Sequence, residues 1–162
     1  MSRIFTEIKK APPCAIALAV AMMFTVLFFF VQSALPPETS SAESSAVSDA
    51  IEPIIPKDTP VGGFVHPNIR KIGHFSEFGI LGIESAIFVF VYTKRRMLSS
   101  FIAVISVQFI AFLDETVQIF SGRGPEISDV WIDIFGFLTL FAITLGAAFA
   151  ARVIMNKLRK NR

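Results

Sequence analysis

The stretch FLDETVQIFSGRGPEISDVWIDIFG, residues 112–136, places acids in the middle of an otherwise apolar region. Four acids of this stretch are candidates for a functional site: Asp114, Glu115, Asp129 and Asp133. Between the two acidic pairs, Gly122, Gly124 and Pro125 indicate a tight turn. We therefore expect two helices that meet at this turn, with their acids near the turn and their apolar parts leading away from it.

Four apolar runs are long enough to cross a bilayer, for which about 20 residues are needed. They lie at residues 14–35, 72–93, 98–120 and 130–155. The chain is 53% hydrophobic and holds 18 Phe against one Tyr and one Trp, a composition that favours lipid-facing surface. Residues 101–113 contain only one Ser and one Gln, so they lack the polar face of a soluble amphipathic helix. The sequence predicts an all-α polytopic membrane protein built as a bundle of four transmembrane helices.

Lys and Arg are distributed unevenly among the connecting segments. Eleven of the 15 fall on segments that four spans place on one side: Arg3, Lys9, Lys10, Lys94, Arg95, Arg96, Arg152, Lys157, Arg159, Lys160 and Arg162. The positive-inside rule then predicts a cytoplasmic N-terminus at 1–13 and a basic cytoplasmic tail at 156–162. The net charge of +2 is too small to indicate nucleic-acid binding, and the single Cys14 excludes a disulfide within one chain.

The long segment 36–70 is expected to form an extracytoplasmic loop before the core at 71–155. It is rich in Ser, Pro and Gly, so it cannot bury a core of its own. Residues 45–55 fit either a short interfacial helix or a flexible linker. The basic start and apolar run at 14–35 also allow a cleaved signal peptide. We expect an uncleaved helix, because the run is longer than the apolar part of such peptides.

The second predicted helix opens with RKIGHFSEF, which carries polar groups inward from the outer surface. Lys71, His74 and Glu77 are spaced by three residues and so occupy neighbouring positions on one helix face. At about 1.5 Å per residue, Glu77 lies roughly 9 Å deeper than Lys71.

The third and fourth helices are expected to bring polar groups to the same depth. Asp114 and Gln118 share a face at the outer end of the third helix. Asp129 is placed as a cap or first-turn residue of the fourth helix, with Asp133 one turn deeper. All these groups fall within roughly the outer 10 Å of the bundle.

So many ionisable groups in a membrane protein indicate a buried site or a buried network, because a charge in the bilayer is costly and usually paired. Lys71 and Arg123 are the expected partners of the carboxylates. The predicted ligand-binding residues are Lys71, His74, Asp114, Glu115, Gln118, Arg123, Asp129 and Asp133. Three roles stay open: recognition of a headgroup, acid–base catalysis, and a purely structural network.

Catalytic residues are not identified by the sequence, although His74 paired with Glu77 or Glu115 is a candidate acid–base pair. No metal and no other cofactor is predicted. Metal-ligand types are offered by His74 with Glu77, Asp114, Glu115 and Asp129. A zinc site usually draws on more His or Cys than this chain has, and His66 is the other histidine.

Two motifs resemble the VanZ-like membrane proteins of bacteria. The first is a Lys-x-x-His-Phe helix start; the second joins an acid-Glu-x-x-Gln run, a Gly-Arg turn and an Asp-x-x-x-(Asn or Asp)-x-x-Gly helix start. The matching positions are Lys71, His74, Phe75, Asp114, Glu115, Gln118, Gly122, Arg123, Asp129, Asp133 and Gly136. The family pattern often has Asn at the position of Asp133.

This resemblance implies a multi-pass protein of the bacterial cytoplasmic membrane, in a family whose founding members are linked to resistance to the glycopeptide teicoplanin. The expected function is recognition of an envelope-lipid or cell-wall-precursor headgroup, or of a lipoglycopeptide, at an outer-leaflet site. Two alternatives stay open: a hydrolase or transferase acting on a lipid-linked envelope substrate, and a structural membrane subunit.

Overall fold

A computed structural model describes residues 12–124 and 126–160 of the protein. The helices are α2 (Pro13–Ser33), α3 (Pro37–Ile51), α4 (Pro60–Val65), the 3-10 helix η1 (His66–Asn68), α5 (Ile69–Tyr92), α6 (Arg96–Phe120) and α7 (Ile127–Lys160). Within these ranges there is no strand, and four helical segments are long and apolar enough to cross a membrane. The predicted all-α membrane fold is confirmed. Predictions for Arg3, Lys9, Lys10, Pro125 and Arg162 concern positions outside the described residues.

Proline and glycine define several of the helix ends. Pro13, Pro37 and Pro60 occupy the first turns of α2, α3 and α4, where a missing N–H removes no helical hydrogen bond. Gly122 follows α6 with a φ of 81°, in the left-handed region that glycine adopts without steric cost. The chain therefore turns back at the position that the glycine-rich link predicted.

Helix α7 is longer than its apolar run. It continues to Lys160, so the segment expected as a tail from residue 156 is helical as far as it is described. Lys157, Arg159 and Lys160 lie in its last turn, where cations interact favourably with the negative end of the helix dipole.

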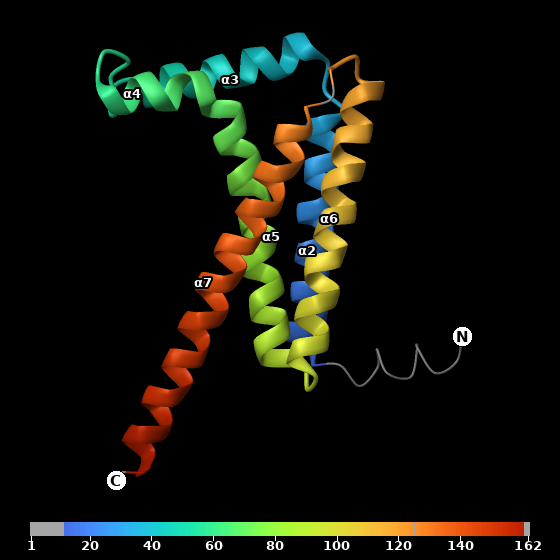
Figure 1. The fold of residues 1–162 in the computed structure, drawn as a ribbon, viewed down its shortest axis with the longest axis vertical. Helices are drawn as coiled ribbons and strands as arrows, with labels where there is room; N and C mark the ends of the chain where they lie inside the picture. Colours follow the sequence, from blue (N-terminus) through green and yellow to red (C-terminus); the bar gives the residue numbers. More distant parts are fainter. Residues whose placement is uncertain (1–11, 125, 161–162) are drawn as a thin grey trace.

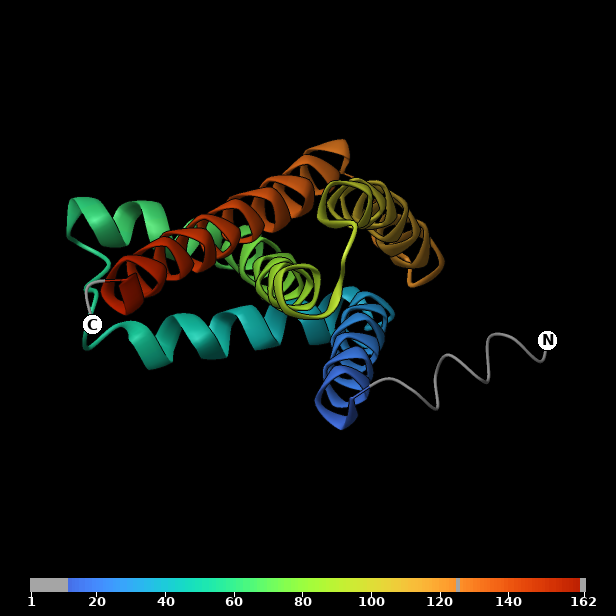
Figure 2. The ribbon, with the colours of Figure 1, turned by 90° about the horizontal axis from the view of Figure 1, so that it is seen from below.

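The segment expected as a loop at 36–70 is mostly helical. α3 and the shorter α4 lie across one end of the bundle formed by the long helices (Figures 1 and 2). We call this the α3 end. α3 buries no residue, in agreement with the prediction that the segment forms no core. It nonetheless begins at Pro37, well before the short helix considered at 45–55, because Pro37 and the first-turn acid Glu38 both favour a helix start.

α5 and α7 cross closely near the middle of the molecule (Figure 1). A Cβ on Gly136 of α7 would overlap the carbonyl oxygen of Phe75. A Cβ on Gly82 of α5 would lie 2.5 Å from the carbonyl oxygen of Phe137. The two glycines let the helix backbones approach to a distance that any side chain would prevent.

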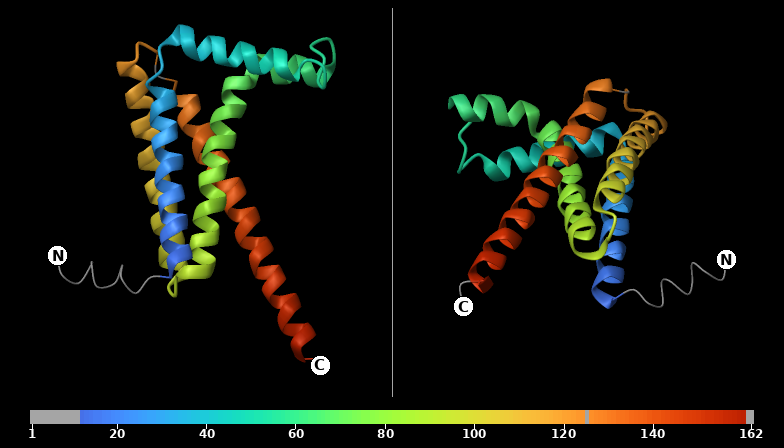
Figure 3. Two further views of the ribbon diagram at one scale, coloured as in Figure 1. Left: turned by 180° about the vertical axis from the view of Figure 1, so that it is seen from behind. Right: turned by 60° about the horizontal axis from the view of Figure 1, so that its bottom comes forward.

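α2 and α6 pack beside this crossed pair. Phe29 of α2 stacks on Phe78 of α5 with ring centroids 4.9 Å apart, and both rings are buried. Beyond the crossing, α7 diverges from the other helices, and its residues 149–160 are exposed (Figures 1 and 3). The hydrophobic core surrounds the crossing and extends along α5 as far as Val89.

Candidate functional site

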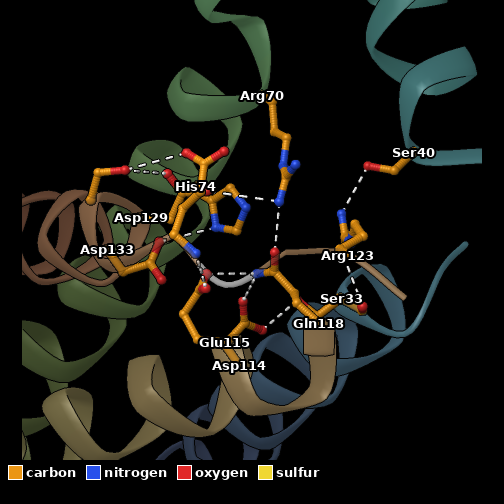
Figure 4. Close-up of polar contacts among 12 residues, drawn as sticks. Ser33, Ser40, Arg70, His74, Asp114, Glu115, Gln118, Arg123, Asp129 and Asp133 are labelled. Carbon is orange, nitrogen blue, oxygen red and sulfur yellow. Dashed lines mark hydrogen bonds and ion pairs between the residues drawn. The ribbon is translucent and has the colours of Figure 1, made fainter. Parts of the chain in front are cut away.

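Polar side chains from α5, α6, α7 and the α6–α7 link meet at the α3 end of the bundle (Figure 4). The buried members of this cluster are His74, Asp114, Glu115, Gln118, Arg123, Asp129 and Asp133. The structure thus brings together seven of the eight residues predicted to bind a ligand. Lys71, the eighth, is exposed.

Gln118 stands at the centre of the cluster and is 0% exposed. Its amide nitrogen donates to Asp114 Oδ2 at 2.9 Å and to Glu115 Oε1 at 3.0 Å. Its amide oxygen accepts a hydrogen bond from Arg70 Nη2 at 2.6 Å. One neutral side chain therefore connects two carboxylates on α6 to a cation on α5.

Arg70, and not Lys71, is the cation of α5 that contacts the polar cluster. Besides Gln118, its guanidinium faces Asp129 Oδ2 at 3.7 Å. Arg70 lies four residues before His74, so the two side chains share a face of α5. Lys71 is turned outward on that helix and forms no ion pair among the described residues, which corrects its predicted role as a partner of the acids.

Arg123 forms no ion pair with a carboxylate of the described residues. It donates to the backbone oxygens of Gln32 and Ser33 at 3.1 and 2.8 Å, and to Ser40 Oγ at 2.9 Å. The turn at Gly122 directs the chain toward the end of α2, so the guanidinium reaches carbonyl oxygens of its last turn. These hydrogen bonds hold the link between α6 and α7 against α2 and α3.

His74 is hydrogen-bonded to Asp133, with Nδ1 3.1 Å from Oδ1. The candidate pairs with Glu77 and Glu115 are not formed. Gly136 sets the close approach of α7 to α5, and this places Asp133, one turn earlier on α7, beside His74. Glu77 instead lines a cavity, and Glu115 accepts hydrogen bonds from Gln118 and from the backbone N–H of Glu126 at 2.9 Å.

Residues of the first membrane helix also reach the site, which the sequence did not predict. Ser33 Oγ donates to Asp114 Oδ1 at 2.5 Å and is buried. Ser40 at the start of α3 contacts Arg123. The signal for Ser33 was present but weak: it is a polar residue at the end of a helix that holds no charge, and such residues are common at helix ends.

Two neighbouring cavities, about 150 and 490 Å³ in volume, lie between α3 and the ends of the long helices. We call them together the α3 cleft. Both are lined by Ser40, Ser44, Arg70 and Arg123, and the smaller one reaches His74 and Glu77. The larger volume lies within the range of small-ligand sites.

The two arginines of the cleft have unused donors. The Nε–H groups of Arg70 and Arg123 are buried and have no hydrogen-bond partner among the described residues. Burial and then the like charge of Arg70 lower the pKa of the Arg123 guanidinium, against an opposing effect of Asp114, Glu115 and Asp129. Glu43, Glu77 and Glu126 also line the cleft, but its two guanidinium groups are suited to an acceptor with negative charge.

A group able to hold a metal ion also lies in the cluster. His74, Asp114 and Asp133 each offer a ligand atom, and these atoms lie within 4.8 Å of one another. The acids weighed from the sequence as metal ligands did not include Asp133, since only the helix crossing brings it to His74.

The model of a family described as VanZ/LLP1 matches residues 15–150. No curated protein and no solved structure matches the chain.

Proposed function

The chain belongs to the VanZ/LLP1 family, as the match over residues 15–150 shows, and from this premise we propose that it binds a lipid-anchored anionic group in the α3 cleft. The group is the headgroup of an envelope lipid or the polar part of a lipid-tailed glycopeptide. Such binding would contribute to resistance to teicoplanin-type antibiotics.

The observation that carries the proposal is the pair of unpartnered arginine donors. A buried N–H without an acceptor costs free energy, about 1–3 kcal/mol by the usual range. Arg70 and Arg123 each have one, and both residues line the same cleft. A phosphate or carboxylate accepts hydrogen bonds from a guanidinium in a geometry that fits its planar fork. The hydroxyl of Ser40, which accepts a hydrogen bond from Arg123, adds a further donor in the same space.

The placement of charge supports an outer-leaflet location. Lys94, Arg95 and the basic last turn of α7 lie at the end of the bundle opposite α3 (Figure 1). The positive-inside rule favours the cytoplasm for that end, which puts the α3 cleft at the outer surface. Headgroups of envelope lipids and of membrane-bound antibiotics are presented at this surface.

The binding experiment uses the purified full-length protein in detergent with phosphatidylglycerol as the probe and diacylglycerol of the same chains as the uncharged reference. We expect preferential binding of phosphatidylglycerol by native mass spectrometry. Arg123→Lys and Arg70→Lys keep the charge but lose the planar fork, so each should weaken binding about 10-fold. Lys71→Gln is the matched control, because it removes an exposed cation beside the cleft. Equal binding of both lipids, or unchanged affinity in both arginine variants, would reject the proposal.

Resistance is measured separately in a teicoplanin-susceptible Gram-positive host. Expression of the protein should raise the inhibitory concentration of teicoplanin, and the Arg123→Lys variant should lose the increase while it still accumulates in the membrane. Lys71→Gln should keep it. If the protein binds the lipid but does not change susceptibility to teicoplanin, recognition of the lipid stands and the role in resistance is rejected.

A second candidate function is acid–base catalysis on a lipid-linked envelope substrate. It is favoured by the hydrogen bond between His74 and Asp133, because a carboxylate that orients an imidazole is the usual arrangement of a general base. Incubation of the protein with envelope lipids should then yield new products by mass spectrometry, and His74→Ala should abolish them. Lipids that are recovered unchanged would reject catalysis and leave recognition.

A further inference from the structure

We infer that His74, Asp114 and Asp133 form a binding site for one divalent first-row cation, where α5, α6 and α7 meet. The site lies beneath the α3 cleft and uses one residue from each helix. It goes beyond the proposed recognition of a lipid-anchored group, because it rests on different atoms and has its own test.

The distance between two of the ligand atoms matches a coordination sphere. His74 Nδ1 and Asp133 Oδ1 are 3.1 Å apart, and the ligand atoms of all three residues lie within 4.8 Å of one another. With metal–nitrogen and metal–oxygen bonds of about 2.0–2.2 Å, two adjacent ligands of one ion are roughly 3.0–3.5 Å apart. The imidazole and the first carboxylate already have this separation.

An unpartnered buried atom points to a ligand at the same place. Asp133 is 0% exposed, and its Oδ2 has no hydrogen-bond donor among the described residues. A carboxylate oxygen left without donor or cation in a buried position is costly. An ion held between His74 and Asp133 supplies the missing positive charge to this carboxylate.

The balance of charge around the three residues also calls for a cation. Arg70 faces Asp129, and Arg123 donates to backbone oxygens and Ser40. Asp114 receives only neutral donors, from Ser33 and Gln118. Asp114 and Asp133 therefore form no ion pair with an arginine or a lysine among the described residues, and buried carboxylates are usually paired or coordinate metals.

The donor set indicates the class of ion. Imidazole nitrogen suits Zn²⁺ and other first-row metals, whereas carboxylate oxygen suits Mn²⁺ and harder ions. A set of one imidazole and two carboxylates therefore favours Mn²⁺ or Zn²⁺ over Ca²⁺. Three protein ligands leave coordination positions for water or a substrate oxygen. His74 also lines the smaller cavity, so these positions are reached from the α3 cleft.

The test uses full-length protein purified in detergent with a tag that contains no histidine and stripped with a chelator. Titration with Mn²⁺ and, separately, with Zn²⁺ should show about one ion per chain. Asp133→Asn keeps the size of the side chain and its hydrogen bond to His74 but removes the charge. Glu84→Gln is the matched control, since Glu84 is an acid of α5 that contacts Thr25, outside the three-residue set.

We expect Asp133→Asn to weaken binding at least 10-fold, the lower end of the loss seen when even outer partners of a metal site are removed. Glu84→Gln should bind like the unaltered protein. Electron spin-echo modulation of bound Mn²⁺ should show an imidazole nitrogen that disappears in His74→Gln. If Asp133→Asn does not fold, the test rests on His74→Gln, through its electron spin-echo spectrum with Mn²⁺ and its affinity for the metal ion. Absence of stoichiometric binding, or binding that survives both changes, would overturn the inference.

Discussion

Gln118 shows how a neutral side chain can organise a group of buried charges. Two carboxylates on its own helix accept hydrogen bonds from its amide nitrogen, while its oxygen accepts one from Arg70. A second cation at this position would compete with Arg70, and an acid would add repulsion to a region already rich in carboxylates. The amide satisfies both signs of charge without adding one, which explains why a glutamine occupies a fully buried position.

Gln118→Leu should destabilise the protein strongly, because leucine fills the space but leaves Asp114, Glu115 and Arg70 each short of one hydrogen bond. Each group left unsatisfied costs about 1–3 kcal/mol. Thermal unfolding in detergent, followed by circular dichroism, should show a clear loss of stability. Gln108→Leu on the same helix is the control, since Gln108 is exposed and should tolerate the change. Equal stability of the two variants would contradict the role given to Gln118.

Some residue positions followed from the sequence and others did not. Asp114 and Gln118 are four apart on one helix, and this spacing alone predicted their contact. The choice between Arg70 and Lys71 did not follow, because both lie at the rim and only the rotation of α5 against its neighbours turns Arg70 inward. The hydrogen bond of His74 to Asp133 likewise depends on a contact between helices rather than on spacing within one.

At the scale of elements, the long helices were predictable and their crossing was not. Apolar runs and a glycine-rich turn were enough to place α2, α5, α6 and α7 to within a few residues at most ends. α3 was harder to predict because it is a polar helix without buried residues, so no apolar periodicity marks its length. Small residues such as those of α5 and α7 are typical of close helix packing, but they do not tell which glycine meets which backbone.

Gly136→Ala should weaken the α5–α7 crossing, since the new methyl group would overlap the Phe75 carbonyl and push the helices apart. Overpacking of this kind costs about 1–3 kcal/mol. Gly146→Ala on the same helix is the control, because a Cβ there has no neighbour within 4 Å. It should leave stability unchanged or raise it by up to about 1 kcal/mol through helix propensity.

Unfolding of the two alanine variants is compared in the same detergent. If only Gly136→Ala lowers the midpoint of thermal unfolding, the result supports the view that the α5–α7 crossing holds the site together. The same variant should also lose preferential phosphatidylglycerol binding, because the α5 residues that line the α3 cleft move with the helix. Two variants of equal stability would show that the helices can separate at no cost, and that Gly136 has another role.

At the scale of the whole molecule, one end holds the buried polar site and is covered by α3. The other end carries the basic α5–α6 link and the basic last turn of α7. The first residue of α2, Pro13, and the last residue of α7, Lys160, both lie at the end of the molecule opposite α3 (Figure 3). The helices that cross the bilayer thus separate a site-bearing end from a cationic end. Recognition of an outer-leaflet headgroup requires that the first of these faces the outside.

Cysteine accessibility in whole cells tests this orientation. Cys14 is the one cysteine of the sequence, so Cys14→Ser gives a background to which single cysteines are added. Ser45→Cys lies on the exposed surface of α3 and should react with a membrane-impermeant maleimide in intact cells. Lys157→Cys, in the last turn of α7, should react only after permeabilisation. The reverse pattern would place the arginines of the α3 cleft in the cytoplasm, where an outer-leaflet ligand does not reach them, and the proposed recognition would fail with it.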